Sequence, residues 1–325
     1  MKSPYVADLQ ANQVATTVLL VTHKDIRQKR TGESYLSLTL ADRTGELDSK
    51  MWDNAAEVME TFERDDFVRV KGVLQVFQNR PQFTIHKLQR VDASEQDLAD
   101  YLPASKRDPA EMWAELQSRI GSIANPHLKA LLDSIFSDQA IASAYRKAPA
   151  AKQIHHAWLG GLLEHVLSLA ALADLTAAHY PVVDRDLLLT GVVLHDIGKI
   201  YELGYERSFS YTVEGQLLGH IVIGAQLADE HIRRLPDFPP KLRLLVQHLI
   251  LSHHGEMAFG SPKVPLFPEA MLLHHLDNMD SKMEAMRSLV ANDKNVAGVW
   301  TAFNSALDRS VLKKETWLKS SPASS

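Results

Sequence analysis

The hydrophobic pattern of the chain changes its period near residue 93, and this change favours folds that join a β domain to an α domain. Before that point, stretches such as "YLSLTLAD" and "FVRVKGVLQVF" alternate apolar and polar side chains, as half-buried strands do. After it, apolar side chains recur at helical spacing. Asp108-Pro109 and Asn125-Pro126 each join an N-cap residue to a proline suited to the first helical turn. A length of 325 residues also fits two domains.

The first domain has the element order β-β-β-α-β-β. This is the order of an OB fold, a small Greek-key barrel that often holds single strands of nucleic acid. We therefore predict a multidomain α and β protein, in which a five-stranded OB-type barrel precedes an all-α domain. Strands are expected at 14–23, 35–42, 47–52, 67–77 and 82–91, with a helix at 55–62. The predicted divisions are the barrel at 14–92, a linker and connecting helix at 93–125, the helical domain at 126–318 and a disordered tail at 319–325.

Composition excludes several classes of site. The chain has no cysteine, so disulfides, thiolate metal sites and cysteine nucleophiles are excluded, and a reducing cytoplasm is the expected location. The formal net charge of −5 means that any contact with nucleic acid must come from local basic patches. No signal-like apolar core opens the sequence, and the apolar run 187–194 is too short to span a membrane.

Basic and aromatic residues of the barrel are candidates for binding nucleic acid. The segment "HKDIRQKR" (23–30) is predicted to be the first inter-strand loop, and Arg80 lies in the last hairpin. In OB folds these two loops flank the ligand groove, where cations contact phosphates and aromatic rings stack on bases. The alternative is a solvated loop with aromatic residues in the core. The candidates are Lys24, Arg27, Lys29, Arg30, Tyr35, Phe77, Arg80 and Phe83.

The helical domain contains an ordered series of histidines and aspartates. His195 and Asp196, in "LHDIGK", follow the apolar run "LLLTGVV", and burying this pair costs free energy unless something compensates. A single histidine in such a place is usually a hydrogen-bonded core residue. A whole series at the edges of apolar helices is better explained by shared cations, which imidazoles and carboxylates ligate together. The series contains more ligands than the four of a structural zinc site, which favours two metals. Its members are His165, His195, Asp196, His220, His253, His254 and Asp277.

These strings also resemble a known family. "HHAWLGGLLEHVLSLA", "LHDIGKIYEL", "GQLLGHIVIG" and "ILSHHGEMAFGSPKVPLFPEAMLLHHLDNMDSKM" are similar to the HD superfamily of metal-dependent phosphohydrolases. Within it, they most resemble the bacterial 3′→5′ exoribonucleases that carry an OB domain before the HD domain (the YhaM type, or CMP-binding factor). The resemblance extends over nearly the whole chain.

The resemblance implies the roles of individual residues. One metal would be held by His165, His195, Asp196 and Asp277. Asp196 would bridge to a second metal, held by His220 and by His253, His254 or both. Mn²⁺ is the expected ion, with Co²⁺, Fe²⁺ or Ni²⁺ as alternatives.

Four further residues have two interpretations each. Lys199, three residues after Asp196, is expected to contact a substrate phosphate, although a helix-terminal lysine is the alternative. His155 and His156 either line the cleft or support the fold. Glu164 either supports His165 or lies on a solvated face.

The expected activity is metal-assisted hydrolysis at the 3′ end of single-stranded RNA, which releases nucleoside 5′-monophosphates. Single-stranded DNA is a further possible substrate, and a homo-oligomer is possible through the helices after residue 282. One alternative is a phosphohydrolase or cyclic-nucleotide phosphodiesterase acting on small nucleotides, for which a strand-holding barrel has no use. The other is a nucleic-acid-binding protein whose metal site is structural. The sequence has no G-x-S-x-G motif and no P-loop, so no protein nucleophile is expected.

Overall fold

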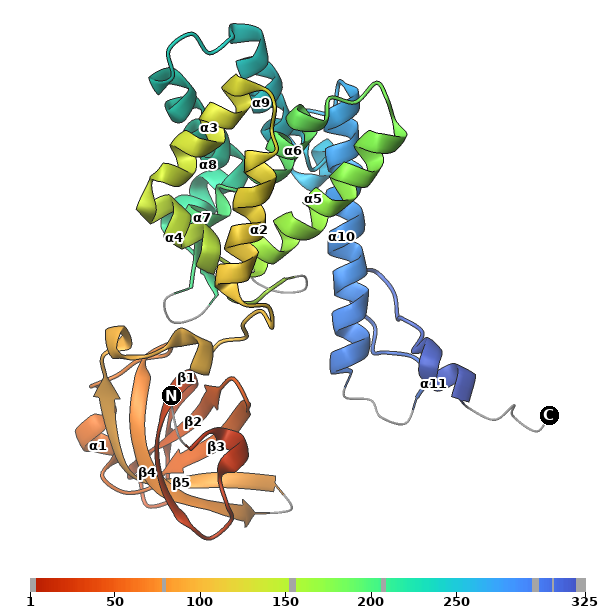
Figure 1. Cartoon of the computed structure of the whole chain (residues 1–325). Coiled ribbons are helices and arrows are strands. Elements are labelled where there is room, and N and C mark those ends of the chain that lie inside the picture. Colours follow the sequence, from red (N-terminus) through yellow and green to blue (C-terminus); the bar gives the residue numbers. More distant parts are fainter. Residues whose placement is uncertain are drawn as a thin grey trace, which may run out of the picture. The chain divides into compact units, whose positions relative to one another are not determined.

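A computed structural model of the chain describes residues 4–77, 80–151, 156–205, 209–293, 298–305 and 307–319. The side chains of Phe77 and Arg80 are outside the described part. The chain forms two compact units, and the boundary lies between Ala104 and Ser105 (Figure 1). The first unit is a β-barrel and the second is helical.

The barrel is closed, with the strand order β1-β2-β3-β5-β4. Neighbouring strands are antiparallel except β3 and β5, which are parallel. This order confirms the predicted five-stranded OB-type barrel. A short helix, α1 (Ala55–Val58), stands where a longer helix at 55–62 was expected. The strands are β1 (Val14–Gln28), β2 (Ser34–Asp42), β3 (Gly45–Met51), β4 (Phe67–Phe77) and β5 (Arg80–Val91).

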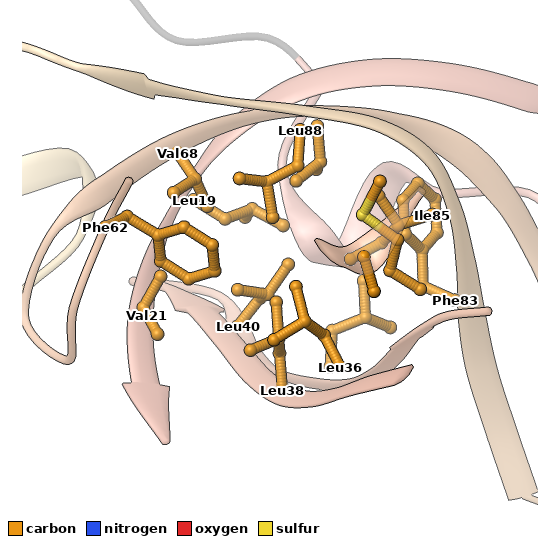
Figure 2. Close-up of a cluster of buried hydrophobic side chains, with 14 residues drawn as sticks. Leu19, Val21, Leu36, Leu38, Leu40, Phe62, Val68, Phe83, Ile85 and Leu88 are labelled. Carbon is orange, nitrogen blue, oxygen red and sulfur yellow. The ribbon is translucent and has the colours of Figure 1, made fainter. Parts of the chain in front are cut away.

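Alternate side chains of each strand fill the interior of the barrel. Leu36, Leu38 and Leu40 of β2 point inward and are almost fully buried, and Phe83 of β5 lies among them (Figure 2). Burial of these apolar side chains is the main source of stability for so small a barrel. The polar residues between them face outward.

The second unit contains ten of the described α-helices. Helices α2 and α3 begin where the sequence predicts, because Asp108 and Asn125 each accept two backbone N–H bonds at the helix start. One detail differs from the expectation of helices alone, since two short strands, β6 (Leu203–Gly204) and β7 (Ser210–Tyr211), pair with each other. The helices of this unit are α2 (Pro109–Gly121), α3 (Pro126–Ser137), α4 (Gln139–Lys147), α5 (Gly161–His179), α6 (Arg185–Leu194), α7 (Lys199–Glu202), α8 (Val213–Arg234), α9 (Pro240–Ser252) and α10 (Pro268–Asn292), followed by α11 (Lys314–Lys319) near the C-terminus.

Helix α5 is long and apolar enough to cross a membrane by length and composition alone. It packs against α6, α10, α2 and α4, and its residues Leu162, Leu163, Val166 and Leu169 are fully buried. The same properties belong to the central helix of a water-soluble helical unit, and this packing gives α5 that role. Helices α5, α6 and α10 therefore form the frame on which the candidate site is built.

Candidate metal centre and nucleic-acid interface

His195 and Asp196 lie in a turn and not within a helix as the sequence suggested. Helix α6 ends at Leu194, residues 195–198 form the turn, and α7 begins at Lys199. Both side chains are buried, with 0 % and 2 % of their surface exposed. Lys199 donates a hydrogen bond to Asp196 Oδ2 at 2.6 Å, so the turn holds a buried ion pair.

One carboxylate oxygen of Asp196 faces the first group of candidate ligands. His195 Nε2 lies 3.3 Å from Asp196 Oδ2, and His165 Nε2, from α5, lies 4.0 Å from it. Asp277 Oδ1, from α10, lies 3.2 Å from His165 Nε2. Two donors that each stand about 2.1 Å from one cation lie about 3 Å apart when they are at right angles, so these separations fit a shared ion.

The other carboxylate oxygen of Asp196 faces a second group. Asp196 Oδ1 lies 3.4 Å from His220 Nε2 and 3.7 Å from His253 Nε2. His254 joins this group, since His220, His253 and His254 each offer a ring nitrogen within 4.8 Å of the others. His253 caps the end of α9 and His254 follows it in a turn. The structure thus brings all seven predicted metal ligands together around Asp196.

The outer nitrogen of each imidazole is held by an oxygen. His195 Nδ1 donates to Val192 O at 2.8 Å, and His253 Nδ1 donates to Ile250 O at 2.7 Å. His254 Nδ1 is held in the same way by Phe259 O at 2.8 Å. A proton on Nδ1 leaves the lone pair on Nε2, which is the form that binds a metal.

Several buried atoms at the centre have no hydrogen-bond partner among the described residues. They are His195 Nε2, His220 Nε2, His253 Nε2 and Asp196 Oδ1. Buried polar atoms are normally paired, and leaving one unpaired costs about 1–3 kcal/mol. Because these atoms converge on two points beside one carboxylate, the residues fit a pair of divalent cations.

The electrostatics of Asp196 and His253 agree with this fit, whereas His165 holds a proton that a cation would displace. Burial opposes ionisation of Asp196, but Lys199 and His195 outweigh it and hold the pKa of Asp196 well below its usual range. Burial, reinforced by His195, holds the pKa of His253 well below 6.5, so its ring is neutral and able to bind a metal at neutral pH. Burial also lowers the pKa of His165, but hydrogen bonds to Asp277 and Asp280 raise it to about 9.

Two carboxylates that sequence reasoning missed hold the ligands in place. Asp280 accepts from His165 Nδ1 at 2.8 Å, and Glu202 Oε1 lies 3.1 Å from His220 Nδ1. Such partners fix the orientation of a metal-binding imidazole. Each lies three residues after a residue that was predicted, Asp277 or Lys199, so helical spacing was the signal that could have found them.

Two glycines, Gly198 and Gly219, determine the position of His220 in α8. Helix α8 is kinked at Gly219, whose φ of +72° suits glycine, and His220 N beyond the kink donates to Glu202 at 3.0 Å. A Cβ on Gly198 would lie 2.0 Å from His220 O. The glycine of "HDIGK" therefore allows α7 and α8 to approach closely enough for His220 to face Asp196.

A cavity of about 620 Å³ opens beside the metal centre. Its lining includes metal-centre residues together with Lys199, Glu202, Tyr211, Phe259, His274, Asn278 and Ser281.

His156 is buried, and its Nε2 lies 3.2 Å from Asp280 Oδ2, so it supports the centre from outside. His155 lies outside the described residues. Glu164 accepts from Trp158 Nε1 at 2.8 Å.

Comparisons with known proteins agree with both units. Residues 162–282 match the HD domain family, and residues 20–91 match a family described as an OB-fold nucleic acid binding domain. Over 289 residues, 89 % of this chain and 90 % of the relative, the sequence is 35 % identical to the 3′-5′ exoribonuclease YhaM of Bacillus subtilis (strain 168). The chain belongs to the YhaM family.

Two solved structures resemble the barrel. They are the second OB-fold domain of replication protein A from Methanococcus maripaludis (18 % identity, 27 % of this chain, 94 % of that chain, TM-score 0.23) and the single-stranded DNA binding protein from Thermus aquaticus (21 % identity, 24 % of this chain, 40 % of that chain, TM-score 0.23). At these TM-scores the similarities support no conclusion about fold or function. The OB fold of this YhaM-family member rests on its strand order and its family match.

Two of the predicted nucleic-acid contacts in this YhaM-family barrel are wrong. Strand β1 continues to Gln28, so most of the segment 23–30 is strand and not loop. Lys24 donates to Phe62 O and pairs with Glu63, and only 8 % of its side chain is exposed, which leaves it unsuited to contact phosphates. Phe83 is 0 % exposed and belongs to the core, because it faces the barrel interior.

Those of the remaining candidates whose side chains are described, Arg27, Lys29, Arg30 and Tyr35, are at least partly exposed. Arg27 and Arg30 are exposed, and Arg27 pairs with Asp25 at 2.8 Å. Lys29 is partly exposed between Glu33 and Asp53. The side chains of Phe77 and Arg80 lie outside the described part of the chain.

A row of three side chains crosses the outer face of β1, β2 and β3. Arg27 is the register partner of Tyr35, and Leu36 is the partner of Met51, so Trp52 lies opposite Tyr35 just past the end of β3. The rings of Tyr35 and Trp52 stack with centroids 4.5 Å apart and planes 26° apart. Trp52, which sequence reasoning missed, is 38 % exposed. A cation beside two stacked rings suits one phosphate and one base of a single strand.

Proposed function

We propose that the protein is a metal-dependent 3′→5′ exoribonuclease that hydrolyses single-stranded RNA to nucleoside 5′-monophosphates. The observation that carries this proposal is the position of Asp196, whose two oxygens face separate groups of imidazoles beside a cavity. Membership of the YhaM family and the outer row of the barrel support RNA as the substrate. The absence of cysteine supports a cytoplasmic location.

The proposed cofactor is a pair of divalent cations, with Mn²⁺ as the expected ion and Co²⁺, Fe²⁺ or Ni²⁺ as alternatives, since the ligands are imidazoles and carboxylates. His165, His195, Asp196 and Asp277 would hold one, and His220, His253, His254 and Asp196 the other. Bound cations would lower the pKa of a water molecule and stabilise the charge that develops on the phosphate.

Lys199 is the proposed phosphate-binding residue. Burial lowers its pKa, but the adjacent Asp196 outweighs this effect and raises the pKa above 10.5, so the ammonium group stays charged. It lines the cavity beside Asp196. A cation that shares Asp196 would compete for its carboxylate and free the ammonium group to contact a phosphate oxygen.

The barrel would hold the strand upstream of the bond to be broken. Arg27, Tyr35 and Trp52 contact backbone and bases without reading sequence, which suits an enzyme that removes successive nucleotides. None of these groups distinguishes a 2′-hydroxyl, so we expect single-stranded DNA to bind as well.

The direct test is a single-stranded RNA labelled at its 5′ end and incubated with the protein and Mn²⁺. We expect a ladder that shortens from the 3′ end, together with nucleoside 5′-monophosphates. His195→Ala and Asp196→Ala should reduce the rate by at least about 1,000-fold, because each removes a ligand of the reacting centre. The matched controls, His179→Ala and Asp133→Ala, change exposed residues that belong to no candidate metal-ligand group and do not line the cavity, and they should leave the rate unchanged.

Two results would contradict the proposal. One is intact RNA with protein that has bound Mn²⁺. The other is faster hydrolysis of free or cyclic nucleotides than of an RNA oligomer at equal concentration, which would favour a small-molecule phosphohydrolase. Lys199→Met should lower the rate on RNA by about 100-fold while Mn²⁺ binding remains. Its control is Lys129→Met, which changes a lysine in a solvent-accessible ion pair on α3.

A further inference from the structure

Helix α10 presents four polar residues to the cavity at helical spacing. His274, Asp277, Asn278 and Ser281 follow one face of the helix over two turns, and all four line the cavity. Asp277 belongs to the metal centre. His274 belongs to none of the candidate metal-ligand groups among the described residues, and Asn278 and Ser281 carry amide and hydroxyl groups instead of an imidazole or a carboxylate.

His274 is held in one orientation. Its Nδ1 donates to His253 O at 2.9 Å, and its ring lies against Gly255. A Cβ at Gly255, where φ is +79°, would come within 2.2 Å of that ring. Because Nδ1 is bonded to a carbonyl, the Nε2 of the neutral ring can accept a hydrogen bond from a ligand.

Asn278 and Ser281 also have hydrogen-bonding capacity to spare. The carboxamide of Asn278 makes no hydrogen bond with any residue that the structure describes, and Ser281 Oγ makes only a long bond, 3.3 Å, to Asn278 O. Carboxamide and hydroxyl groups both donate and accept. This is the combination that suits the hydroxyl groups of a sugar.

The size and lining of the cavity suit a single nucleotide. Its volume of about 620 Å³ lies in the range of small-molecule sites and leaves no room for a folded strand. Asp196 and Lys199 mark the place of the phosphate, and the exposed aromatic residues Tyr211 and Phe259 offer surfaces for a base. Along α10, Ser281 is about 6 Å beyond Asp277, so the polar face extends from the metal centre toward the sugar of a bound nucleotide.

We propose that Asn278 and Ser281, with His274 beside them, bind the sugar of the 3′-terminal nucleotide and read its free 3′-hydroxyl. This inference rests on the proposed function. It explains how the site would recognise the end of a strand, because a nucleotide that carries a 3′-phosphate or a further residue cannot present that hydroxyl.

The test uses four RNA oligomers with 5′ labels that differ only in the last sugar. These end in a 3′-hydroxyl, a 3′-deoxy sugar, a 2′-deoxy sugar or a 3′-phosphate. Wild-type protein should remove the normal terminal nucleotide about tenfold faster than the 3′-deoxy nucleotide, which is the scale of one or two lost hydrogen bonds. The 3′-phosphate should slow removal at least as much, and the 2′-deoxy sugar should change the rate by less than about threefold.

Substitutions on α10 test which residues produce the preference for a 3′-hydroxyl end. Asn278→Ala and Ser281→Ala should each slow removal of the normal nucleotide by about five- to tenfold and leave the rate on the 3′-deoxy oligomer unchanged. Met279→Ala, an exposed change on the same helix, is the control and should alter neither rate. Calorimetry with Mn²⁺ should show the same pattern at equilibrium, with AMP bound about tenfold more tightly than 3′-deoxy-AMP by the wild type and about equally by Asn278→Ala.

The outcomes separate this inference from the proposed function. If wild-type protein degrades RNA but treats 3′-hydroxyl and 3′-deoxy ends alike, the inference is wrong and the nuclease assignment stands. The inference is equally wrong if the 2′-deoxy sugar carries the penalty, or if both variants keep the discrimination. If the wild type removes nothing from any oligomer, the proposed function itself has failed.

Discussion

Asp280 accepts a hydrogen bond from His165 Nδ1 at 2.8 Å, while the opposite nitrogen of the same ring lies 3.2 Å from Asp277 Oδ1. Ser168 and His156 also donate to Asp280, so three donors fix its carboxylate. The ring of His165 is therefore held between a supporting carboxylate and the metal centre, with Nε2 directed at the first cation position.

Replacing Asp280 should weaken one cation selectively. Asp280→Asn keeps the shape of the side chain but removes the charge that orients His165, and loss of such a partner typically costs 10- to 100-fold in metal affinity. Calorimetric titration with Mn²⁺ should show this loss for one of two equivalents. Asp133→Asn, in an exposed pair on α3, is the control. Unchanged affinity for both equivalents would show that His165 does not need Asp280.

Glu202 should support the other cation in the same way. Its carboxylate accepts from His220 N and lies 3.1 Å from His220 Nδ1. Glu202→Gln should lower the affinity of the second equivalent by about 10- to 100-fold and leave the first unchanged. The exposed Glu63→Gln in the barrel is the control. If the Asp280 and Glu202 variants weaken the same equivalent, the two groups do not hold separate cations.

The ligands of the metal centre could be predicted from the sequence because each is a polar residue within or next to a largely apolar stretch. That contrast comes from the cost of burying charge, which leaves few explanations for a His-Asp pair after "LLLTGVV". The supporting carboxylates Glu202 and Asp280 carry no such contrast. Their neighbours in sequence are polar or mixed, so their helical spacing from Asp277 and Lys199 was the signal available, and the folded positions of α7, α8 and α10 show what they contact.

The barrel was predictable in topology but less so in its surface. Period-two alternation fixes which side chains point inward, and the five strands follow from it. It does not fix where a strand ends, so the extension of β1 through Lys24 to Gln28 was missed. Trp52 follows β3, and its stacking on Tyr35 depends on the register between β2 and β3, which a single sequence does not display.

Metal affinity should rise with pH up to about pH 9. Burial lowers the pKa of His165, but Asp277 and Asp280 raise it to about 9, so in the metal-free protein a cation must displace a proton at neutral pH. Apparent affinity should increase by up to about tenfold per pH unit between 6.5 and 9. Mn²⁺ titrations in buffers of different ionisation enthalpy count the released proton, and no release at pH 7.5 would contradict the prediction.

The raised pKa of His165 also affects the stability of the metal-free protein, but stability should fall as the pH rises, whereas metal affinity should increase. A folded-state pKa above the unfolded value of 6.5 means that the protonated ring stabilises the fold. This contribution is complete below about pH 6.5 and is lost as pH rises through about 9. Urea unfolding of metal-free protein at pH 6.5 and 9 should show the decline, and His165→Gln should reduce it.

Trp52 should contribute to binding of single strands without contributing to the metal centre. Base stacking on an aromatic ring contributes about 1–3 kcal/mol, so Trp52→Ala should weaken binding of an RNA oligomer by about 5- to 100-fold. Fluorescence anisotropy with metal-free protein measures the binding alone. Tyr180→Ala is the control, because it removes an exposed aromatic residue of the other unit that does not line the cavity. Equal loss in both variants would show that the barrel row is not the main platform.

Gly198 should be required for the second cation because no larger residue fits between α7 and α8. A Cβ there would lie 2.0 Å from His220 O and 2.7 Å from Gly224 N. Gly198→Ala must separate the helices, which costs about 1–3 kcal/mol in unfolding free energy, and the displaced His220 should lower the affinity of the second Mn²⁺ by at least about tenfold.

The control for Gly198 is Gly121→Ala at the end of α2, where an added Cβ meets nothing within 4 Å. It should leave metal binding unchanged and alter stability by less than about 1 kcal/mol. Urea unfolding and Mn²⁺ titration measure both effects. A Gly198→Ala protein that is as stable as the wild type and binds both equivalents normally would mean that the close approach of α7 and α8 does not position His220, and that the glycine of "HDIGK" has another role.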